Sequence, residues 1–334
     1  MNKGGLNLPF SYMWKIGDIE IKGKVILAPM AGFTSTGYRA FMKKFGVDVS
    51  YSEMVSDMGL IYGNEETLTY LRSTKEERPL GIQLFGSDPE NIVKAAKIVE
   101  DVTNNFDFFD INAGCPVNKV TKSGAGSSLL KNPTVLADIV KALKQNTKKP
   151  VTVKIRLGWD NSHINFLEVI RLLEEAKVDA IAIHARTTKE LYSGTPHYDL
   201  LKDLQSKTSV PLIISGNIFT LDDAINALDV TGAKAVMVAR GSLGNPILIK
   251  QIHTFFETGE GIPNATLDEQ KEYCLELARC LINEKGEDTA MRIYRSIAPK
   301  FFSGFKDSNP LRCKLAQNMS TYQYLEDTLK EYNP

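Results

Sequence analysis

The sequence predicts an α/β protein, a (β/α)8 TIM barrel followed by a small all-helical C-terminal domain. Eight short apolar runs recur in the first three quarters of the 334-residue chain, amphipathic segments separate most of them, and most runs end in a polar residue. Apolar runs without strict alternation are typical of strands buried on both faces of a parallel sheet. A doubly wound open sheet is the alternative, but no GxGxxG follows the first run, and that fold normally needs only six strands.

The expected elements follow in order along the chain. The eight predicted strands are residues 25–30, 47–54, 80–85, 108–112, 151–157, 180–184, 211–215 and 235–239. Helical periodicity marks the intervening segments 89–103, 133–145, 164–176 and 221–228. Ser87 or Asp88 can cap the first of these helices, and Thr220 the last. Beyond Pro246 only helical segments follow, at 266–285, 287–302 and 321–332. We therefore expect a barrel domain over 1–245 and a helical domain over 246–334.

Charge is balanced over the whole chain, with 40 basic and 40 acidic residues. The molecule as a whole therefore has no bulk attraction for a polyanion, and any nucleic-acid contact must be local. One local excess lies at 291–314, where Asp307 is the single acid against Arg292, Arg295, Lys300, Lys306, Arg312 and Lys314. Aromatic residues interleave with these cations: Tyr294, Phe301, Phe302 and Phe305. Such a segment is either a solvated basic face or a surface that contacts phosphates and stacks bases.

The cysteines and the amino terminus indicate a soluble cytoplasmic protein, which we expect to be a monomer. Four cysteines (Cys115, Cys274, Cys280 and Cys313) show no CxxC spacing or paired framework. Residues 1–24 lack the long apolar segment of a secretory signal, and no apolar stretch approaches the ~20 residues needed to span a bilayer. The four histidines lack HxH or HExxH spacing, so we expect no metal site.

Polar residues gather at the carboxyl ends of the predicted strands, which is the rim where TIM barrels bind their ligands. They are Ser52, Glu53, Gln83, Asn112, Cys115, Lys154, Arg156, His184, Arg186, Ser215, Asn217 and Arg240. Packing alone would leave apolar residues at strand ends as often as in strand centres. This concentration of polar groups predicts a binding site.

The rim residues favour a phosphorylated flavin, FMN. Glycines follow both of the last two strands, in Ser215-Gly216-Asn217 and Ala239-Arg240-Gly241, where these barrels usually bind phosphate. The first strand ends at Pro29 and Met30 in a turn of small residues that lets a flat ring approach. Gln83, Lys154 and His184 offer an amide, a cation and an imidazole, which suit the polar edge of a flavin. Taken singly, each could equally make a structural hydrogen bond.

Cys115 is the candidate reacting group, although an isolated cysteine is more often a small buried hydrophobe. It follows a buried strand on a loop fixed by Gly114 and Pro116. With an ordinary pKa of ~8.5, a thiol is roughly 97% protonated at pH 7. It therefore suits proton donation to a carbanion better than nucleophilic attack. No GxSxG elbow points to serine catalysis.

Several motifs together resemble the tRNA-dihydrouridine synthases, from about residue 17 to the carboxyl terminus. They are Leu27-Ala-Pro-Met-Ala-Gly-Phe-Thr34, Tyr38-Arg39, Ser52-Glu-Met54, Asp110-Ile-Asn-Ala-Gly-Cys-Pro116, Gly124-Ala-Gly-Ser-Ser-Leu-Leu130, Val153-Lys-Ile-Arg156, His184-Ala-Arg-Thr187, Tyr192-Ser-Gly194, Ser215-Gly-Asn217 and Ala239-Arg-Gly241. The chain departs from the family pattern at Ser35, where an acid is usual, and at Gly37-Tyr38, where Pro-Phe often precedes the arginine.

The resemblance implies FMN-dependent reduction of the C5–C6 double bond of uridine in tRNA, with NADPH reducing the flavin. By that resemblance Cys115 protonates C5, Arg186 lies near the substrate, and Asn112 holds the flavin or an extruded base. The residues expected around FMN are Pro29, Met30, Gln83, Asn112, Lys154, His184, Ser215, Gly216, Asn217, Ala239, Arg240 and Gly241. Arg292, Arg295 and Lys300 of the basic segment are the expected tRNA contacts. Extrusion of a base from structured RNA costs a few kcal/mol, which backbone contacts can offset.

Two alternatives stay open. A small-molecule FMN reductase of the dihydroorotate dehydrogenase type has a similar cysteine motif, but the longer match and the basic helical tail argue against it. A non-catalytic RNA-binding protein that kept the barrel as a scaffold would have no need of Cys115. The resemblance leaves open the uridine position, ribosomal RNA as a further substrate, and NADPH against NADH.

Overall fold

The computed structural model of the chain describes residues 13–334. Residues 1–12, the first half of the segment 1–24 in which no secretory signal is predicted, lie outside the described residues. It confirms the barrel, whose strands are all parallel. They are β3 (Val25–Leu27), β4 (Ser50–Tyr51), β6 (Leu80–Phe85), β7 (Phe108–Ala113), β8 (Val151–Arg156), β9 (Ala180–His184), β10 (Leu212–Ser215) and β11 (Ala235–Val238). β5 (Val55–Ser56) follows β4 along the chain and, like β4, pairs in parallel with β6. A parallel bridge between Ile26 and Val49 closes the barrel.

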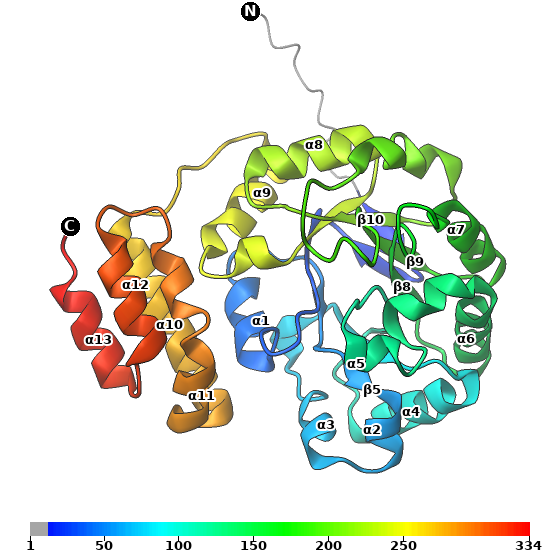
Figure 1. The fold of residues 1–334 in the computed structure, drawn as a ribbon, viewed down its shortest axis with the longest axis horizontal. Coiled ribbons are helices and arrows are strands. Elements are labelled where there is room, and N and C mark those ends of the chain that lie inside the picture. The colour runs from blue at the N-terminus through cyan, green and yellow to red at the C-terminus, as the bar shows by residue number, and fades with distance from the viewer. Residues whose placement is uncertain (1–12) are drawn as a thin grey trace, which may run out of the picture.

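Helices cover the outside of the barrel (Figure 1). They are α1 (Thr36–Lys43), α2 (Asp57–Ile61), α3 (Glu65–Thr69), α4 (Pro89–Val102), α6 (Pro133–Asn146), α7 (Phe166–Glu175), α8 (Leu221–Thr231) and α9 (Pro246–Thr258). The short α5 (Asn118–Thr121) instead follows the Cys115 loop at the carboxyl rim. The four predicted helices are confirmed as α4, α6, α7 and α8. Asp88 and Thr220 accept cap hydrogen bonds at the starts of α4 and α8, as expected. Between β9 and β10, only short 3-10 turns stand where a barrel helix is usual: η3 (Tyr198–Leu201) and η4 (Leu204–Lys207).

An additional hairpin, outside the predicted strands, fills one end of the barrel interior. β1 (Trp14–Ile16) pairs antiparallel with β2 (Ile19–Ile21) around a turn at Gly17. Its apolar side chains pack with inward residues of the barrel strands, including Phe108 and Ile213. The polar ligand site therefore forms at the opposite end, where the strands terminate.

The carboxyl-terminal helices form a separate bundle beside α1 and α9 (Figure 1). They are α10 (Leu267–Lys285), α11 (Glu287–Tyr294), η6 (Ala298–Phe302), α12 (Ser308–Gln317) and α13 (Tyr322–Glu331). α9 packs on β3 and α8. α12 lies in a segment without a predicted helix. None of the helices in residues 13–334 combines the length and apolarity needed to cross a membrane.

The bundle is joined to the barrel by apolar and polar contacts. The rings of Phe45 and Tyr273 meet edge to face with centroids 5.0 Å apart. The Gln270 side chain donates hydrogen bonds to the carbonyls of Gly244 and Phe301 at 3.3 and 3.1 Å. Gly244 follows β11, so this contact fixes η6 beside the carboxyl rim of the barrel.

Candidate active site

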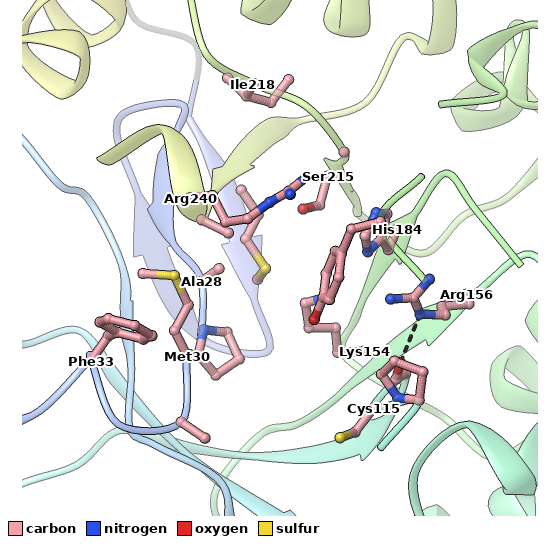
Figure 2. A pocket seen from close by; sticks show the side chains of 18 of the residues that line it. Ala28, Met30, Phe33, Cys115, Lys154, Arg156, His184, Ser215, Ile218 and Arg240 are labelled. Atoms are coloured by element: carbon pink, nitrogen blue, oxygen red, sulfur yellow. Dashed lines mark hydrogen bonds between the residues drawn. The ribbon is translucent and has the colours of Figure 1, made fainter. Parts of the chain in front are cut away.

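A cavity of about 410 Å³ opens at the carboxyl rim of the barrel. Ligand sites in proteins are typically 300–1,000 Å³ and mostly apolar, with a few convergent polar groups. The predicted residues that line it are Cys115, Pro29, Met30, Asn112, Lys154, His184, Ser215, Gly216, Asn217, Ala239, Arg240 and Gly241. Figure 2 shows Met30 and Phe33 on one side of this space, with Cys115, Lys154 and His184 across from them.

Strand register brings the polar residues to common levels of the barrel. Asn112 pairs with Lys154 across β7 and β8. One step further toward the rim, His184 pairs with Arg156 on one side and Ser215 on the other. Because side chains alternate along a strand, residues two apart share the inward face. The cavity floor is therefore polar, whereas the barrel interior below it is apolar.

The Cys115 loop is held by hydrogen bonds to its backbone. The backbone N–H of Cys115 donates to Asn112 Oδ1 at 2.9 Å, and its carbonyl accepts from Ser127 N and Oγ at 3.0 and 2.9 Å. The side chain is half-buried and lines the cavity. Burial raises the pKa of the thiol, against smaller opposing effects from the Val117 N–H and nearby cations. Cys115 is therefore a neutral thiol at pH 7.

Two cations flank the thiol and have different surroundings. Burial, with a contribution from Arg156, lowers the pKa of Lys154 to about 8. The Arg156 guanidinium donates to the carbonyls of Gly114, Thr187 and Leu191, each at 2.8 Å. Arg156 therefore ties the cysteine loop to the loop after β9. Lys154 has a side chain that can meet an anionic ligand, and its charge near pH 8 depends on what occupies the cavity.

His184 is neutral at pH 7. Burial, followed by the charges of Arg156 and Lys154, holds the pKa of its imidazole well below the usual 6.5. Arg186 Nη1 lies 3.3 Å from His184 Nε2. Because a guanidinium can only donate, Nε2 is the acceptor and the proton resides on Nδ1. His184 can therefore donate a hydrogen bond from Nδ1.

The loops after β10 and β11 form one edge of the cavity. Asn217 has a left-handed backbone conformation, with φ of 47°, and its Oδ1 accepts from Arg240 Nη2 at 3.2 Å. A Cβ at Gly241 would lie 2.0 Å from the Ile218 carbonyl oxygen, so only glycine fits there. Bare backbone and a guanidinium thus meet where the sequence predicts phosphate binding.

Two predicted ligand contacts do not line the cavity. Gln83 is fully buried one level deeper, because its strand register places it beside Asp110 rather than Asn112. Arg186 is also buried, and it donates to the carbonyls of Ser193 and Gly194 at 2.8 and 2.5 Å. Its guanidinium holds the loop after β9 in place. The structure thus gives both residues supporting contacts instead of a place on the cavity wall.

Three aromatic side chains at the mouth were not predicted as site residues. Tyr192 is 52% exposed, Phe219 is 42% exposed, and Phe33 is half-buried; all three line the cavity. The Arg240 guanidinium lies over both exposed rings, 4.8 Å from the Tyr192 centroid and 5.5 Å from that of Phe219. An aromatic residue beside glycines in a strand-end loop, as in Tyr192-Ser193-Gly194, is the sequence signal that could have identified the first.

The basic segment of the helical bundle is only partly free to contact RNA. Arg292 and Lys300 are exposed, whereas Arg295 is half-buried and donates to the Met319 carbonyl at 2.7 Å. Stacking by the interleaved rings is contradicted for Tyr294, Phe301 and Phe302, which are buried in the core of the bundle. Tyr294 donates to the Cys274 carbonyl at 2.6 Å. The rings of Tyr192 and Phe219 are exposed at the barrel mouth instead.

Comparison with known proteins decides the family. The family model described as dihydrouridine synthase (Dus) matches residues 26–332. The chain belongs to the dihydrouridine synthase family. It is 31% identical over 319 residues to tRNA-dihydrouridine synthase B of Shewanella oneidensis, covering 96% of each chain. It is 35% identical to tRNA-dihydrouridine synthase B of Vibrio cholerae, covering 84% of this chain and 87% of the relative. This dihydrouridine synthase homologue is therefore an oxidoreductase by family.

Solved structures support the barrel fold of this family member. Histamine dehydrogenase from Rhizobium sp. 4-9 matches with a TM-score of 0.56 at 15% identity, over 83% of this chain and 50% of that one. A variant of NCR from Zymomonas mobilis matches with a TM-score of 0.51 at 16% identity, over 78% of this chain and 94% of that one. Across residues 13–334, no cluster of three His, Cys, Asp or Glu side chains is arranged to hold a metal ion.

Proposed function

We propose that this protein reduces the C5–C6 double bond of uridine in tRNA to give 5,6-dihydrouridine, using FMN and NADPH, with Cys115 as the proton donor. The observation that carries the proposal is the cavity, which places the Cys115 thiol on the same wall as Lys154 and His184. Family membership supports the reaction class, since curated relatives across 84–96% of this chain are named tRNA-dihydrouridine synthases.

The lining residues fit FMN. Pro29, Met30 and Ala28 give a low, apolar wall for a flat ring. The neutral imidazole of His184 and the cation of Lys154 offer a donor and a positive charge to its polar edge. Arg240 suits its phosphate as a cation, and Gly241 lets the loop after β11 pack closely on the Ile218 carbonyl, which holds this edge of the cavity in place. When bound and reduced, the flavin would supply a hydride to uridine C6.

Cys115 completes the reaction from the protein side. Its neutral thiol gives a proton to C5, forming a C–H bond and leaving a thiolate that takes a proton back from solvent. The raised pKa keeps the thiol protonated at pH 7, so that it can donate its proton. Arg156 orients the loop through the Gly114 carbonyl at 2.8 Å. Protonation by a positioned acid typically contributes 10²–10⁴-fold in rate.

The tRNA approaches a mouth that combines cations and exposed rings. Lys119 and Lys122 are exposed on the short α5 segment that follows the Cys115 loop. On the bundle side, η6 brings Lys300 close to Gly244, since a Cβ on Gly244 would lie 2.5 Å from the Lys300 carbonyl carbon. Tyr192 and Phe219 can stack on an extruded base. The predicted contacts Arg292 and Lys300, both exposed, would meet the phosphate backbone.

Position-resolved mapping of dihydrouridine tests this proposal. We expect cells that lack the protein to lose dihydrouridine at one or more tRNA positions, and the wild-type chain to restore it. An unchanged level at every position in tRNA and ribosomal RNA would refute the proposal. Purified protein should also be yellow or bind added FMN; protein that cannot bind flavin would favour the non-catalytic RNA-binding alternative.

Charge contacts are tested separately by tRNA affinity. Reversing Arg292 and Lys300 to Glu should weaken tRNA binding by roughly tenfold or more and reduce its salt dependence, because each phosphate contact contributes about one unit to the salt slope. Lys94 and Lys97, both exposed on α4, provide a double reversal with the same change of charge. Equal effects of both reversals would show that the basic segment is a solvated face.

A further inference from the structure

We propose that Asp110 is a positioning residue, whose acceptor-only carboxylate fixes the orientation of the Gln83 and Asn112 amides and so holds the Cys115 loop in place. The inference rests on the proposed function for the role of Cys115, but its geometry can be tested without turnover. Asp110 is fully buried and does not line the cavity, so it contacts no ligand there.

A chain of short hydrogen bonds joins Asp110 to the loop. Gln83 Nε2 donates to Asp110 Oδ2 at 2.6 Å, and Asn112 Nδ2 donates to Gln83 Oε1 at 2.7 Å. Asn112 Oδ1 then accepts from the backbone N–H groups of Cys115 and Gly114, at 2.9 and 3.2 Å. The other Asp110 oxygen accepts from Thr152 Oγ1 at 2.5 Å.

The two ends of this chain impose the same direction on every bond. A backbone N–H can only donate, so Asn112 must present Oδ1 to the loop and Nδ2 to Gln83. An ionised carboxylate can only accept, so Gln83 must present Nε2 to Asp110 and Oε1 to Asn112. Because both requirements agree, a single arrangement of the two amides satisfies all partners.

A reversed amide would be costly in this setting. Turning Gln83 by half a turn would place its Oε1 against the Asp110 carboxylate and its Nε2 against Asn112 Nδ2. A buried donor or acceptor without a partner costs roughly 1–3 kcal/mol, and low polarity around it increases that cost. Asp110 therefore acts at a distance, through Gln83 and Asn112, on the backbone that carries the thiol.

The nature of the side chain at position 110 should decide the outcome. In Asp110→Asn, Oδ1 can still accept from Gln83 while Nδ2 donates to Thr152 Oγ1. The donor and acceptor of each hydrogen bond between Gln83, Asn112 and the Cys115 loop therefore stay the same. Asp110→Leu keeps the branching of the side chain, although it is larger, and leaves Gln83 Nε2 without an acceptor. Asp110→Asn combined with Thr152→Val removes the group that orients the new amide. Thr152→Val alone leaves the carboxylate in place and should have little effect.

Peptide-resolved alkylation of the full-length protein by iodoacetamide tests the inference. We expect Cys115 to react faster in D110L and in D110N/T152V, by about fivefold, which corresponds to about 1 kcal/mol of lost orientation. D110N and T152V should each stay within about twofold of wild type. Cys313 is exposed on α12 and is the internal reference, whose rate must not change.

The inference is overturned if the double variant, folded by its thermal transition, keeps the wild-type Cys115 rate. Should D110L fail to fold, the nearly isosteric D110N/T152V still decides. Faster Cys115 alkylation in the variants, together with a flavin-loaded wild-type protein that makes no dihydrouridine, would reject the proposed function while retaining the positioning role. Unchanged alkylation in an enzyme that does make dihydrouridine would reject only the positioning role.

Discussion

Glu284, in the last turn of α10, accepts a hydrogen bond of 2.7 Å from the backbone N–H of Gly37 in the first turn of α1. The same carboxylate oxygen accepts from Ser35 Oγ at 2.7 Å. Ser35 is at the N-cap position of α1 but makes no cap hydrogen bond with its own helix. An acid from the helical bundle therefore caps a barrel helix, and its negative charge suits the positive end of the helix dipole.

This contact predicts that Glu284→Ala loosens the bundle from the barrel. Loss of a helix cap costs about 1 kcal/mol, so we expect a lower melting temperature and weaker tRNA binding, with FMN affinity unchanged. Glu284→Gln keeps an acceptor oxygen and should retain more of the stability. Differential scanning fluorimetry and tRNA titration measure these effects. A Glu284→Ala variant that matches wild type in both would show that the cap contributes nothing to docking.

The neutral state of Cys115 predicts slow alkylation near neutral pH. Burial raises the pKa of the thiol above its ordinary value, and only the thiolate reacts with iodoacetamide. The rate at Cys115 should therefore still be rising above pH 9. Exposed Cys313 in the same sample provides the comparison. A Cys115 rate that levels off below pH 8 would mean a stabilised thiolate, contradicting the role as proton donor.

Lys154 predicts that FMN affinity falls in alkaline solution. Burial lowers the pKa of its ammonium to about 8, and an anionic ligand binds the protonated form better. Affinity should therefore fall by up to about tenfold per pH unit above pH 8. Lys154→Met should bind FMN more weakly at pH 7 and lose this dependence between pH 7 and 9. Flavin fluorescence titration gives FMN affinity as a function of pH for both proteins. The same pH dependence in both would show that Lys154 does not contact FMN.

Asp110 predicts a stability difference that depends on pH. Burial raises its pKa from 3.8 to about 6, so the folded state binds this proton more tightly than the unfolded state. The resulting stability is present below pH ~4 and is lost as pH rises to ~6. At pH 7 the buried charge costs on the order of 3 kcal/mol. Asp110→Asn should therefore melt at a higher temperature than wild type at pH 7.5, with a smaller difference at pH 5. The opposite trend with pH would contradict this assignment.

The residues around the cavity were predictable because each lies at the end of its own strand. Gly216, Arg240 and Lys154 could be assigned from local sequence once a parallel barrel was assumed, since all strand ends then meet at one rim. The displacement of Gln83 could not be assigned this way. It depends on the register between β6 and β7, which pairs Gln83 with Asp110, and register is a property of two strands.

The carboxyl-terminal segment shows a second limit. Phe301 and Phe302 are adjacent in sequence and both buried, because η6 lies between the bundle and the loop after β11. A helical period alone would place neighbours on different faces. Pro310 lies within the first turn of α12, where proline is tolerated, although in sequence it argues against a helix. The β1–β2 hairpin had a signal in the alternating Lys15 to Ile21 segment.

The most direct test of the central claim is the dihydrouridine formed by purified protein with FMN, NADPH and tRNA from cells that lack the protein. Nucleoside mass spectrometry measures the product. We expect the wild-type chain to form dihydrouridine and Cys115→Ala to form it about 10²-fold or more slowly while still binding FMN. No product from flavin-loaded wild-type protein would contradict the proposed activity, and equal rates for the two proteins would contradict the role of Cys115.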